Sequence, residues 1–322
     1  MNRIREACVT DITGVTVGHA QNDEGGSGCT VILYGGDYLT SCDVRGGGPA
    51  SKETELLKPE CANKGVQAIV LTGGSAFGLD ACMGVMDWLE EHKRGVAIAG
   101  GYVPIVPGAA LFDLPVGDWN CRPDRKMGYE ACRNAKAGPV EEGVVGAGTG
   151  AGIGKYCGWD HMMKGGLGTY ALRVGDVIVG AIVAVNAAGD VYDIDTNEII
   201  AGAFGEKPGD WKGPEKYFER AIATPPPAGG NTTIGLVVTN AKLDKAMLRK
   251  MAEVAHNGYA RAIRPAHTLS DGDTIFASTT AEVESDANAV FALASEVMAR
   301  AVMRAAKLAK SAYGHPGAAD MR

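Results

Sequence analysis

The residue of this sequence with the clearest capacity for chemistry is a threonine that follows a glycine-rich loop. Thr232 comes directly after Gly229-Gly230-Asn231 and begins the run TTIGLVVT, which is typical of a buried strand. Its hydroxyl could attack the carbonyl carbon of Asn231, move the acyl group from nitrogen to oxygen and leave an ester that water cleaves. The freed α-amino group, whose ordinary pKa is about 8, would then serve as the base for its own hydroxyl. The junction permits a self-cleaving amide hydrolase, and an ordinary strand start fits the same residues.

Two carboxylates stand before the next expected strand, in the sequence Asp271-Gly272-Asp273-Thr274. Alone, these residues predict a turn. They also resemble the start of a calcium-binding loop, but the later ligands of such a loop are missing. Two carboxylates that flank a glycine could instead orient and charge-balance an N-terminal ammonium. The eight cysteines and six histidines show no zinc spacing, so we expect no metal and no cofactor.

A dense glycine segment, GAGTGAGIGK over 146–155, superficially resembles a phosphate-binding loop. That motif needs glycine where Thr149 stands and serine or threonine where Tyr156 stands, so nucleotide binding is not expected. The interpretation we favour is a close-approach loop that carries Lys155.

Ser75, in Gly73-Gly74-Ser75-Ala76-Phe77, occupies a strand–turn–helix context. A nucleophile elbow would need glycine in place of Phe77. We expect Ser75 to cap the helix that follows, with a substrate-binding role as the alternative. A Ser75 hydrolase that uses His256 or His267 as its base also stays open.

Hydrophobic periodicity predicts strands and helices in mixed order. Strands are expected at 29–34, 66–72, 167–174, 176–185, 232–239 and 274–280, and helices at 76–92, 244–263 and 286–310. The third and fourth strands are separated by one glycine, which indicates an antiparallel hairpin. Residues 101–118 and 224–230 suggest exposed connections, and the tail after Tyr313 suggests a frayed end. Without strict βαβ alternation, sheets with helices packed on both faces fit better than a doubly wound sheet.

Composition places the chain among ordinary globular proteins, with 46% hydrophobic and 21% charged residues. The formal net charge of −7 excludes a basic footprint for nucleic acid. The sequence contains no run of about 20 apolar residues that would indicate a membrane span. Its first residues also lack the apolar region of a secretory signal. Unpaired cysteines favour a reducing compartment, so we expect a cytoplasmic protein.

Six stretches, spread in order over nearly the whole chain, carry a family resemblance: DVRGGGP (43–49), LTGGSAFGLDA (71–81), GAGTGAGIGK (146–155), AVNAAGD (184–190), NTTIGLVVTNAKL (231–243) and HTLSDGDTIFA (267–277). They resemble the P1/DmpA peptidase family, family S58. Its members include L-aminopeptidase/D-esterase, β-peptidyl aminopeptidases and nylon-oligomer hydrolases. The Asn-Thr junction combined with DGDT is the most specific part of the match.

The resemblance implies one catalytic domain over 1–322, cleaved between Asn231 and Thr232 into an α chain (1–231) and a β chain (232–322). It implies an αββα layered sandwich, similar to N-terminal-nucleophile hydrolases but with different connectivity, and a homo-oligomer, often a tetramer. Residue by residue, the resemblance assigns the nucleophile to Thr232 and an oxyanion-binding side chain to Asn186. It assigns an acidic pair to Asp271 and Asp273, and a lysine of the nylon-hydrolase branch to Lys155.

One departure concerns an active-site tyrosine of the family, which aligns near Phe112, so its hydroxyl is absent here, and Phe112 is expected to contribute to substrate binding. Tyr102 is a candidate substitute, and pocket-forming loops such as 101–140 decide the substrate. The expected activity is hydrolysis of amide, and by extension ester, bonds by an aminopeptidase on small peptides or amino amides. Alternatives are an endo-type hydrolase of 6-aminohexanoate oligomers, an acyltransferase of related fold, and a binding protein that kept the fold.

Overall fold

The computed structural model describes residues 4–223 and 230–321. Its main strands form one continuous ten-stranded system in which β3 (Ser27–Val44) takes part in two sheets. The second half of β3 pairs with β17 (Thr274–Val283) in a first sheet. The other strands of that sheet are β1 (Ile4–Ala7), β11 (Gly166–Val174), β12 (Val177–Asn186) and β15 (Thr232–Ala241). The first half pairs within a second sheet, formed with β2 (Val15–Asn22), β4 (Ala50–Lys52), β5 (Val66–Thr72) and β8 (Gly108–Ala110).

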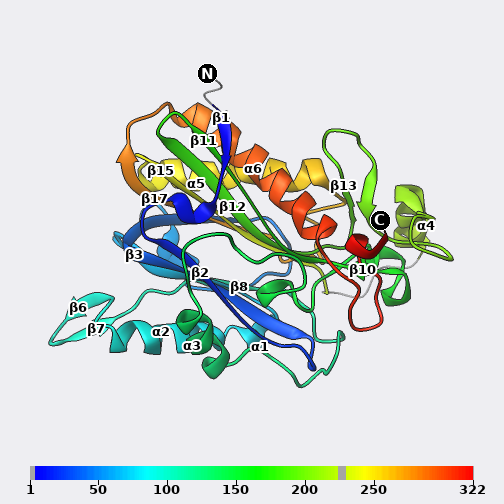
Figure 1. Cartoon of the computed structure of the whole chain (residues 1–322), viewed down its shortest axis with the longest axis horizontal. Helices are drawn as coiled ribbons and strands as arrows, with labels where there is room; N and C mark the ends of the chain where they lie inside the picture. Colours follow the sequence, from blue (N-terminus) through cyan, green and yellow to red (C-terminus); the bar gives the residue numbers. More distant parts are fainter. Residues whose placement is uncertain (1–3, 224–229, 322) are drawn as a thin grey trace.

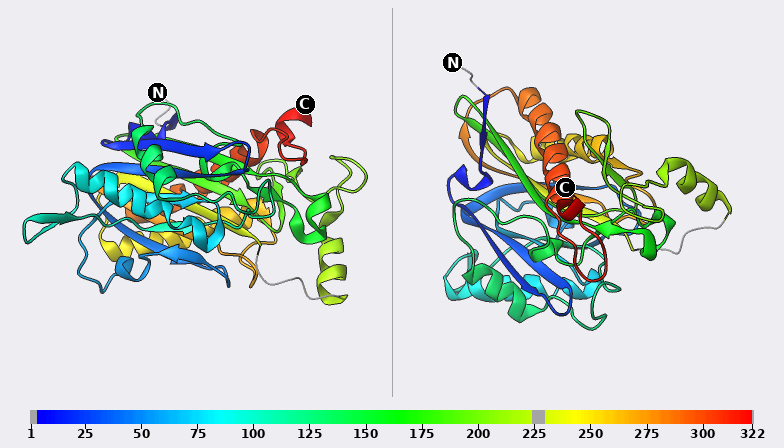
Figure 2. Two further views of the ribbon diagram at one scale, coloured as in Figure 1. Left: turned by 90° about the horizontal axis from the view of Figure 1, so that it is seen from below. Right: turned by 45° about the vertical axis from the view of Figure 1, so that its right-hand side comes forward.

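Helices cover the outer faces of both sheets, as Figure 1 shows. On one side lie α5 (Lys245–Ala262) and α6 (Ala287–Lys307), and on the other lie α2 (Ala81–Glu91) and α3 (Arg125–Arg133). The remaining elements are short: α1 (Ser75–Gly78), α4 (Gly213–Ala223), β6 (Val96–Ile98), β7 (Gly101–Val103), β9 (Gly152–Ile153), β10 (Met163–Lys164), β13 (Asp190–Tyr192), β14 (Ile199–Ala201) and β16 (Ile263–Arg264). The right-hand view in Figure 2 shows the same helix–sheet–sheet–helix order from another direction.

Three buried clusters correspond to the three interfaces between these four layers. Along β12, Val179 and Val183 pack with α5 and α6, whereas Ile178 and Ile182 pack against the second sheet. This is the period-two alternation of a strand that is covered on both faces. A third cluster joins the second sheet to α2 and α3. The predicted αββα sandwich is therefore confirmed.

Sheet topology brings the ends of three strands to one edge. β15 and β17 are parallel and are connected through α5, so both begin at the same edge of the sheet. β12 is antiparallel to β15 and ends there, with Asn186 directly opposite Thr232. The residues before β17 reach the same place, because Asn231 and Asp271 form a bridge. The fold itself assembles the DGDT turn, the AVNAAGD turn and the Asn-Thr junction.

Several local predictions need correction. The expected helix 76–92 is two helices, α1 and α2, because Gly78 packs so closely on Gly73 that a Cβ would lie 1.8 Å from its carbonyl oxygen. The loop 101–118 contains two short strands, β7 and β8. The tail after Tyr313 is not frayed, since Pro316 accepts a hydrogen bond from the Lys164 N–H and the helical turn Ala318–Met321 follows. The connection predicted over 224–230 lies, apart from Gly230, outside the described residues.

Two further properties concern membranes and cysteines. None of the helices in the described ranges combines the length and the apolar character that a membrane crossing requires. All eight cysteines are free thiols, as expected.

Candidate active site

The Asn231–Thr232 junction lies where β15 begins. The Thr232 side chain is buried, and its hydroxyl donates a hydrogen bond to the carbonyl oxygen of Asn231, the residue it follows. The same carbonyl oxygen accepts a hydrogen bond from the Gly272 N–H at 3.0 Å. The hydroxyl of Thr232 is therefore next to the carbonyl that self-cleavage would attack, and a backbone donor already points at the oxygen that would become negative.

Of the two carboxylates of the DGDT turn, Asp273 accepts a hydrogen bond from the backbone of the strand that Thr232 begins. Its Oδ1 accepts the Thr233 N–H at 2.7 Å, and its Oδ2 accepts the backbone N–H of His267 at 2.9 Å. The Nδ1 of His267 lies 2.8 Å from the same Oδ2. Asp273 thus fixes the strand one residue beyond Thr232, and His267 fixes Asp273.

Asp271 forms the other side of this turn. Its Oδ2 accepts two hydrogen bonds from Thr268, from the backbone N–H at 2.7 Å and from the hydroxyl at 2.5 Å. Burial, and after it the charge of Asp273, raise the pKa of Asp271 above its ordinary range. The DVRGGGP segment supports the turn, because the Gly48 N–H donates to the Asp271 carbonyl at 2.8 Å.

Lys155 is buried and makes three hydrogen bonds through its Nζ. The acceptors are the Asn186 carbonyl at 2.9 Å, Asn186 Oδ1 at 2.7 Å and the Gly230 carbonyl at 2.6 Å. An ammonium has three N–H groups, so all three are used. Burial lowers the pKa of Lys155 to about 7, against the opposing effect of Asp271 and other carboxylates.

The side chain of Asn186 is held on both of its polar atoms. Its Oδ1 accepts the Gly152 N–H at 2.9 Å as well as Lys155 Nζ, and its Nδ2 donates to the Phe112 carbonyl at 2.8 Å. One N–H of the amide is engaged by Phe112, and the second is the one that could act as a donor to a substrate. The structure therefore brings Thr232, Asn186, Lys155, Asp271 and Asp273 together at one edge of the sheet.

The sequence that builds this site matches a known family. The family model for peptidase family S58 matches residues 7–319. The chain belongs to peptidase family S58. Members of a peptidase family hydrolyse amide bonds, and the family predicted from the sequence is confirmed.

Two of the relatives have names that refer to hydrolysis of amide bonds. An aminopeptidase of Mycobacterium leprae (strain TN), described as uncharacterized, is 42% identical over 96% of this chain and 92% of its own length. The 6-aminohexanoate-oligomer endohydrolase of Paenarthrobacter ureafaciens is 33% identical over 94% of this chain and 87% of its own length. Among solved structures, the L-aminopeptidase D-Ala-esterase/amidase of Ochrobactrum anthropi, described as a variant of the Ntn-hydrolase fold, superposes with a TM-score of 0.72 at 20% identity, covering 96% of this chain and 88% of that one.

Phe112, where S58 members are expected to carry a tyrosine, lies among aromatic side chains. Its ring is 6.2 Å from that of Trp119 and 6.5 Å from that of Trp159, measured between centroids. Tyr102 belongs to β7, and the β6–β7 hairpin projects from the opposite end of the molecule to α4 (Figures 1 and 2). Because α4 begins beside Tyr156, the neighbour of Lys155, the structure does not support Tyr102 as a substitute.

Ser75 does not have the predicted capping role. Gly74 occupies the N-cap position, no side chain caps α1, and Ser75 is the first helical residue, with a φ of +54°. Its N–H donates to the Leu111 carbonyl at 2.9 Å, which links this turn to the strand leading to Phe112. A substrate-binding role for Ser75 stays a prediction.

The histidines of the rival serine mechanism are engaged elsewhere. His256 Nε2 lies 3.2 Å from the Asp43 carbonyl, and His267 holds Asp273. The sequence reasoning missed the role of His267, although its position four residues before Asp271 in HTLSDGDT was a possible signal. Within the described ranges, no group of three or more His, Cys, Asp or Glu side chains is placed to hold a metal ion.

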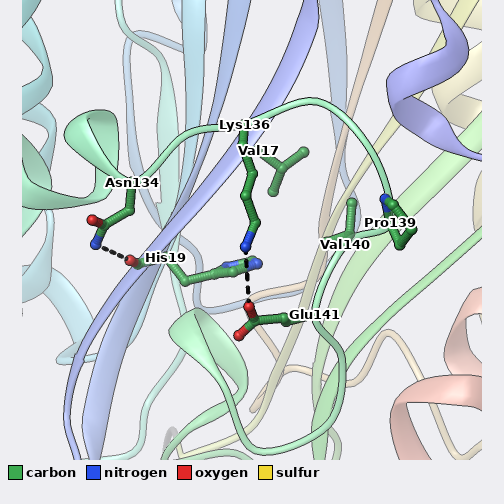
Figure 3. A pocket seen from close by; sticks show the side chains of 7 residues that line it. All are labelled: Val17, His19, Asn134, Lys136, Pro139, Val140 and Glu141. Carbon is green, nitrogen blue, oxygen red and sulfur yellow. Dashed lines mark hydrogen bonds and ion pairs between the residues drawn. The ribbon is translucent and has the colours of Figure 1, made fainter.

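A separate hollow of about 260 Å³ lies beside β2 and the segment after α3 (Figure 3). At this hollow, Lys136 and Glu141 form an ion pair of 3.3 Å. His19 Nδ1 lies 3.0 Å from the Thr30 hydroxyl, which accepts the Ala147 N–H. The lining residues, none of them predicted for the site, are Val17, His19, Asn134, Lys136, Pro139, Val140 and Glu141. Through Thr30, this region supports the start of the glycine-rich loop, and we assign no chemistry to it.

Gly272 offers a steric test of the junction. A Cβ at this position would lie 2.9 Å from Thr232 Oγ1 and 3.0 Å from the Gly48 carbonyl oxygen. We expect Gly272→Ala to displace the Thr232 hydroxyl and, if the chain cleaves itself at this junction, to slow that cleavage by at least about tenfold, which corresponds to about 1.4 kcal/mol of barrier. Gly36→Ala is the matched control, because a Cβ at Gly36 meets nothing within 4 Å. Equal cleavage rates for both variants would contradict the tight packing at Gly272.

Proposed function

We propose that this S58 member is a self-cleaving hydrolase of amide bonds with Thr232 as its N-terminal nucleophile. The observation that carries the proposal is the buried Thr232 hydroxyl bonded to the Asn231 carbonyl, whose oxygen also receives the Gly272 N–H. In the precursor, the hydroxyl oxygen attacks the Asn231 carbonyl carbon, the C–N bond breaks and an ester forms. Water then hydrolyses the ester to the Asn231 carboxylate, restoring the Thr232 hydroxyl beside its new α-amino group.

In the mature enzyme, the α-amine of Thr232 takes the proton of its own hydroxyl as the oxygen attacks the substrate carbonyl. The second N–H of Asn186 is the proposed donor to the oxyanion, held in place by Lys155, Gly152 and Phe112. The substrate amine leaves with the proton, and water releases the acid from the acyl ester. Asp271 and Asp273 hold the turn under the nucleophile and balance the charge of the ammonium form.

The same proposal covers chain organisation and setting. The single catalytic domain would mature into chains 1–231 and 232–322, act in the cytoplasm on small peptide or amide substrates, and assemble as a homo-oligomer, most simply a tetramer. The aminopeptidase and endohydrolase names of the relatives support two modes of cutting, from an N-terminus or within a chain. Transfer of an acyl group to glutamate, measured against release of free acid, separates hydrolysis from the acyltransferase alternative.

Intact mass spectrometry of the purified protein tests the proposal directly. We expect two polypeptides that end at Asn231 and begin at Thr232, because the junction is assembled by the fold without any other component. Sequencing from the N-terminus should read Thr-Thr-Ile-Gly for the smaller one. A fully active sample that contains one uncut chain of 322 residues would overturn the proposal.

A further inference from the structure

The residues before the cleaved bond mark the space that the acyl side of a substrate would occupy in the mature site. Gly230 and Asn231 stand on the acyl side of the Thr232 nitrogen, and the Asn231 carbonyl is in hydrogen-bond contact with the Thr232 hydroxyl. An external substrate must bring its own carbonyl carbon to that hydroxyl. Its acyl portion must therefore enter the space that Gly230 and Asn231 leave after cleavage.

The carbonyl of Gly230 is the group that acylates the nitrogen of Asn231. It accepts one of the three hydrogen bonds of the Lys155 ammonium, at 2.6 Å, while Asn186 accepts the other two. Lys155 is buried, so water does not replace a lost partner freely. A substrate that carries a carbonyl at this position keeps all three hydrogen bonds.

We infer that the mature site selects substrates whose acyl-side residue has an acylated nitrogen, so that it cuts within a chain of amides rather than releasing a free N-terminal residue. This inference rests on the proposed function and names its substrate class. The chemistry that recognises the substrate is a secondary amide carbonyl placed one residue before the cleaved bond.

A substrate with a free N-terminus would meet the opposite situation. The oxygen and nitrogen of one amide are about 2.3 Å apart. An amine at the position of the Asn231 nitrogen would therefore stand no more than about 5 Å from Lys155 Nζ. Below the pKa of Lys155, the ammonium form of the substrate would face a like charge at short range, and Lys155 would lose its third acceptor.

The carboxylates with the largest electrostatic effect on Lys155 do not remove this conflict. Asp271 and Asp113 are the two whose charges act most strongly on Lys155. Asp113 accepts the Gly74 N–H at 2.6 Å and the Ser27 hydroxyl at 2.8 Å, and Asp271 accepts both donors of Thr268. Both carboxylates are committed to hydrogen bonds within their own loops, so neither is placed to pair with a substrate ammonium.

The surroundings of Gly230 suit a further unit of the substrate. A Cβ at this position would lie 3.8 Å from Phe112 Cδ1 and 3.8 Å from Trp159 Cζ2, which is ordinary van der Waals contact. The two rings therefore flank the unit that precedes the cleaved residue. Phe112 supplies apolar surface where a tyrosine would have supplied a hydroxyl, so we assign it to substrate binding.

A matched series of 4-nitroanilides built on the native junction tests this inference with the purified, cleaved enzyme. The members are Asn-anilide, acetyl-Asn-anilide, acetyl-Gly-Asn-anilide and N-ethyl-Asn-anilide, with the same four compounds built on Ala. The N-ethyl compounds match the acetyl compounds in size but keep a cationic nitrogen. The readouts are kcat/KM and, where turnover is slow, the mass of the acyl ester on the chain that begins at Thr232.

We expect kcat/KM for the acetyl compounds to exceed that of the free amines and of the N-ethyl compounds by at least about tenfold, because a site built around a substrate carbonyl rejects analogues that lack it. Acetyl-Gly-Asn-anilide should be better still, and Phe112→Ala should remove that added gain. The inference would be overturned if the enzyme cleaved the free amines as well as or better than the acetyl compounds. If Thr232→Ala abolished that turnover, the proposed function would still stand. Turnover that survives Thr232→Ala would instead overturn the proposed function.

Discussion

Replacing Thr232 with alanine is expected to give an uncut chain with no hydrolase activity. The substitution removes the hydroxyl that contacts the Asn231 carbonyl, so the acyl shift cannot begin, and the α-amine that would serve as base is never released. Denaturing electrophoresis should show one chain, and turnover of any amide that the wild type hydrolyses should fall by at least about a thousandfold. Because alanine removes only a hydroxyl and a methyl group, the fold should persist, which circular dichroism checks.

The adjacent hydroxyl provides a matched control. Thr233 is also buried and β-branched, and its link to the site runs through its backbone N–H, which Thr233→Val keeps. We therefore expect Thr233→Val to be cleaved and active, and Thr232→Ser to keep both properties at a changed rate. Cleavage that survives Thr232→Ala but not Thr233→Val would move the nucleophile by one residue and contradict the assignment.

Local patterns were sufficient for the strands that form this site. The run from Thr232 has the composition of a buried strand, and the structure starts β15 at this residue. The single glycine at 175 predicted the hairpin that β11 and β12 form. The helix predicted over 76–92 failed because its periodicity continues across Gly78, while the interruption follows from the close approach of the backbone at Gly78 to that at Gly73. Periodicity records which face of a segment is buried, and it does not record close approaches between backbones.

The site itself needed more than local pattern. Asn186 and Lys155 have no common motif, and their contact depends on the pairing of β12 with β15 and on the glycine-rich loop passing under both. The resemblance to a family supplied these residues where spacing did not. Ser75 was assigned a cap from its residue type, but its positive φ follows from the sharp turn at Gly74 and from the hydrogen bond to Leu111. His267 was predicted only as a base for Ser75, because its nearness in sequence to the DGDT turn does not reveal which carboxylate it contacts in the fold.

Replacing Lys155 with methionine is expected to slow self-cleavage by at least about tenfold, or about 1.4 kcal/mol of barrier, because Lys155 positions Asn186 and the Gly230 carbonyl beside the cleaved bond. Methionine has a similar length and no charge, so it fits a buried position. It leaves Asn186 Oδ1 without its ammonium donor and frees the Gly230 carbonyl next to the cleaved bond. Pulse-labelled or freshly translated chains, followed by electrophoresis, give the rate.

Lys164→Met is the control for loss of a buried charge. Lys164 is fully buried, donates to the Thr149 carbonyl at 2.8 Å and the Ala151 carbonyl at 2.6 Å, and burial lowers its pKa to about 7 as well. Both variants should alter the free energy of unfolding similarly, by no more than about 3 kcal/mol. Only Lys155→Met should slow cleavage markedly, since Lys164 reaches Asn186 indirectly, through the loop before Gly152. Equal losses of cleavage would assign Lys155 a purely structural role.

The pH dependence of self-cleavage follows from the same lysine. An ordinary lysine keeps its proton up to about pH 10.4, but burial lowers the pKa of Lys155 to about 7. Below this value the ammonium donates to all three of its acceptors, and above it the neutral amine has only two N–H groups for them. The cleavage rate of freshly made chain should therefore fall as pH rises through about 7, and the residual rate of Lys155→Met should lack that fall. A wild-type cleavage rate that rises steadily from pH 6 to 9 would contradict this prediction. It would mean that self-cleavage does not need the three hydrogen bonds that the Lys155 ammonium donates beside the Asn231–Thr232 bond.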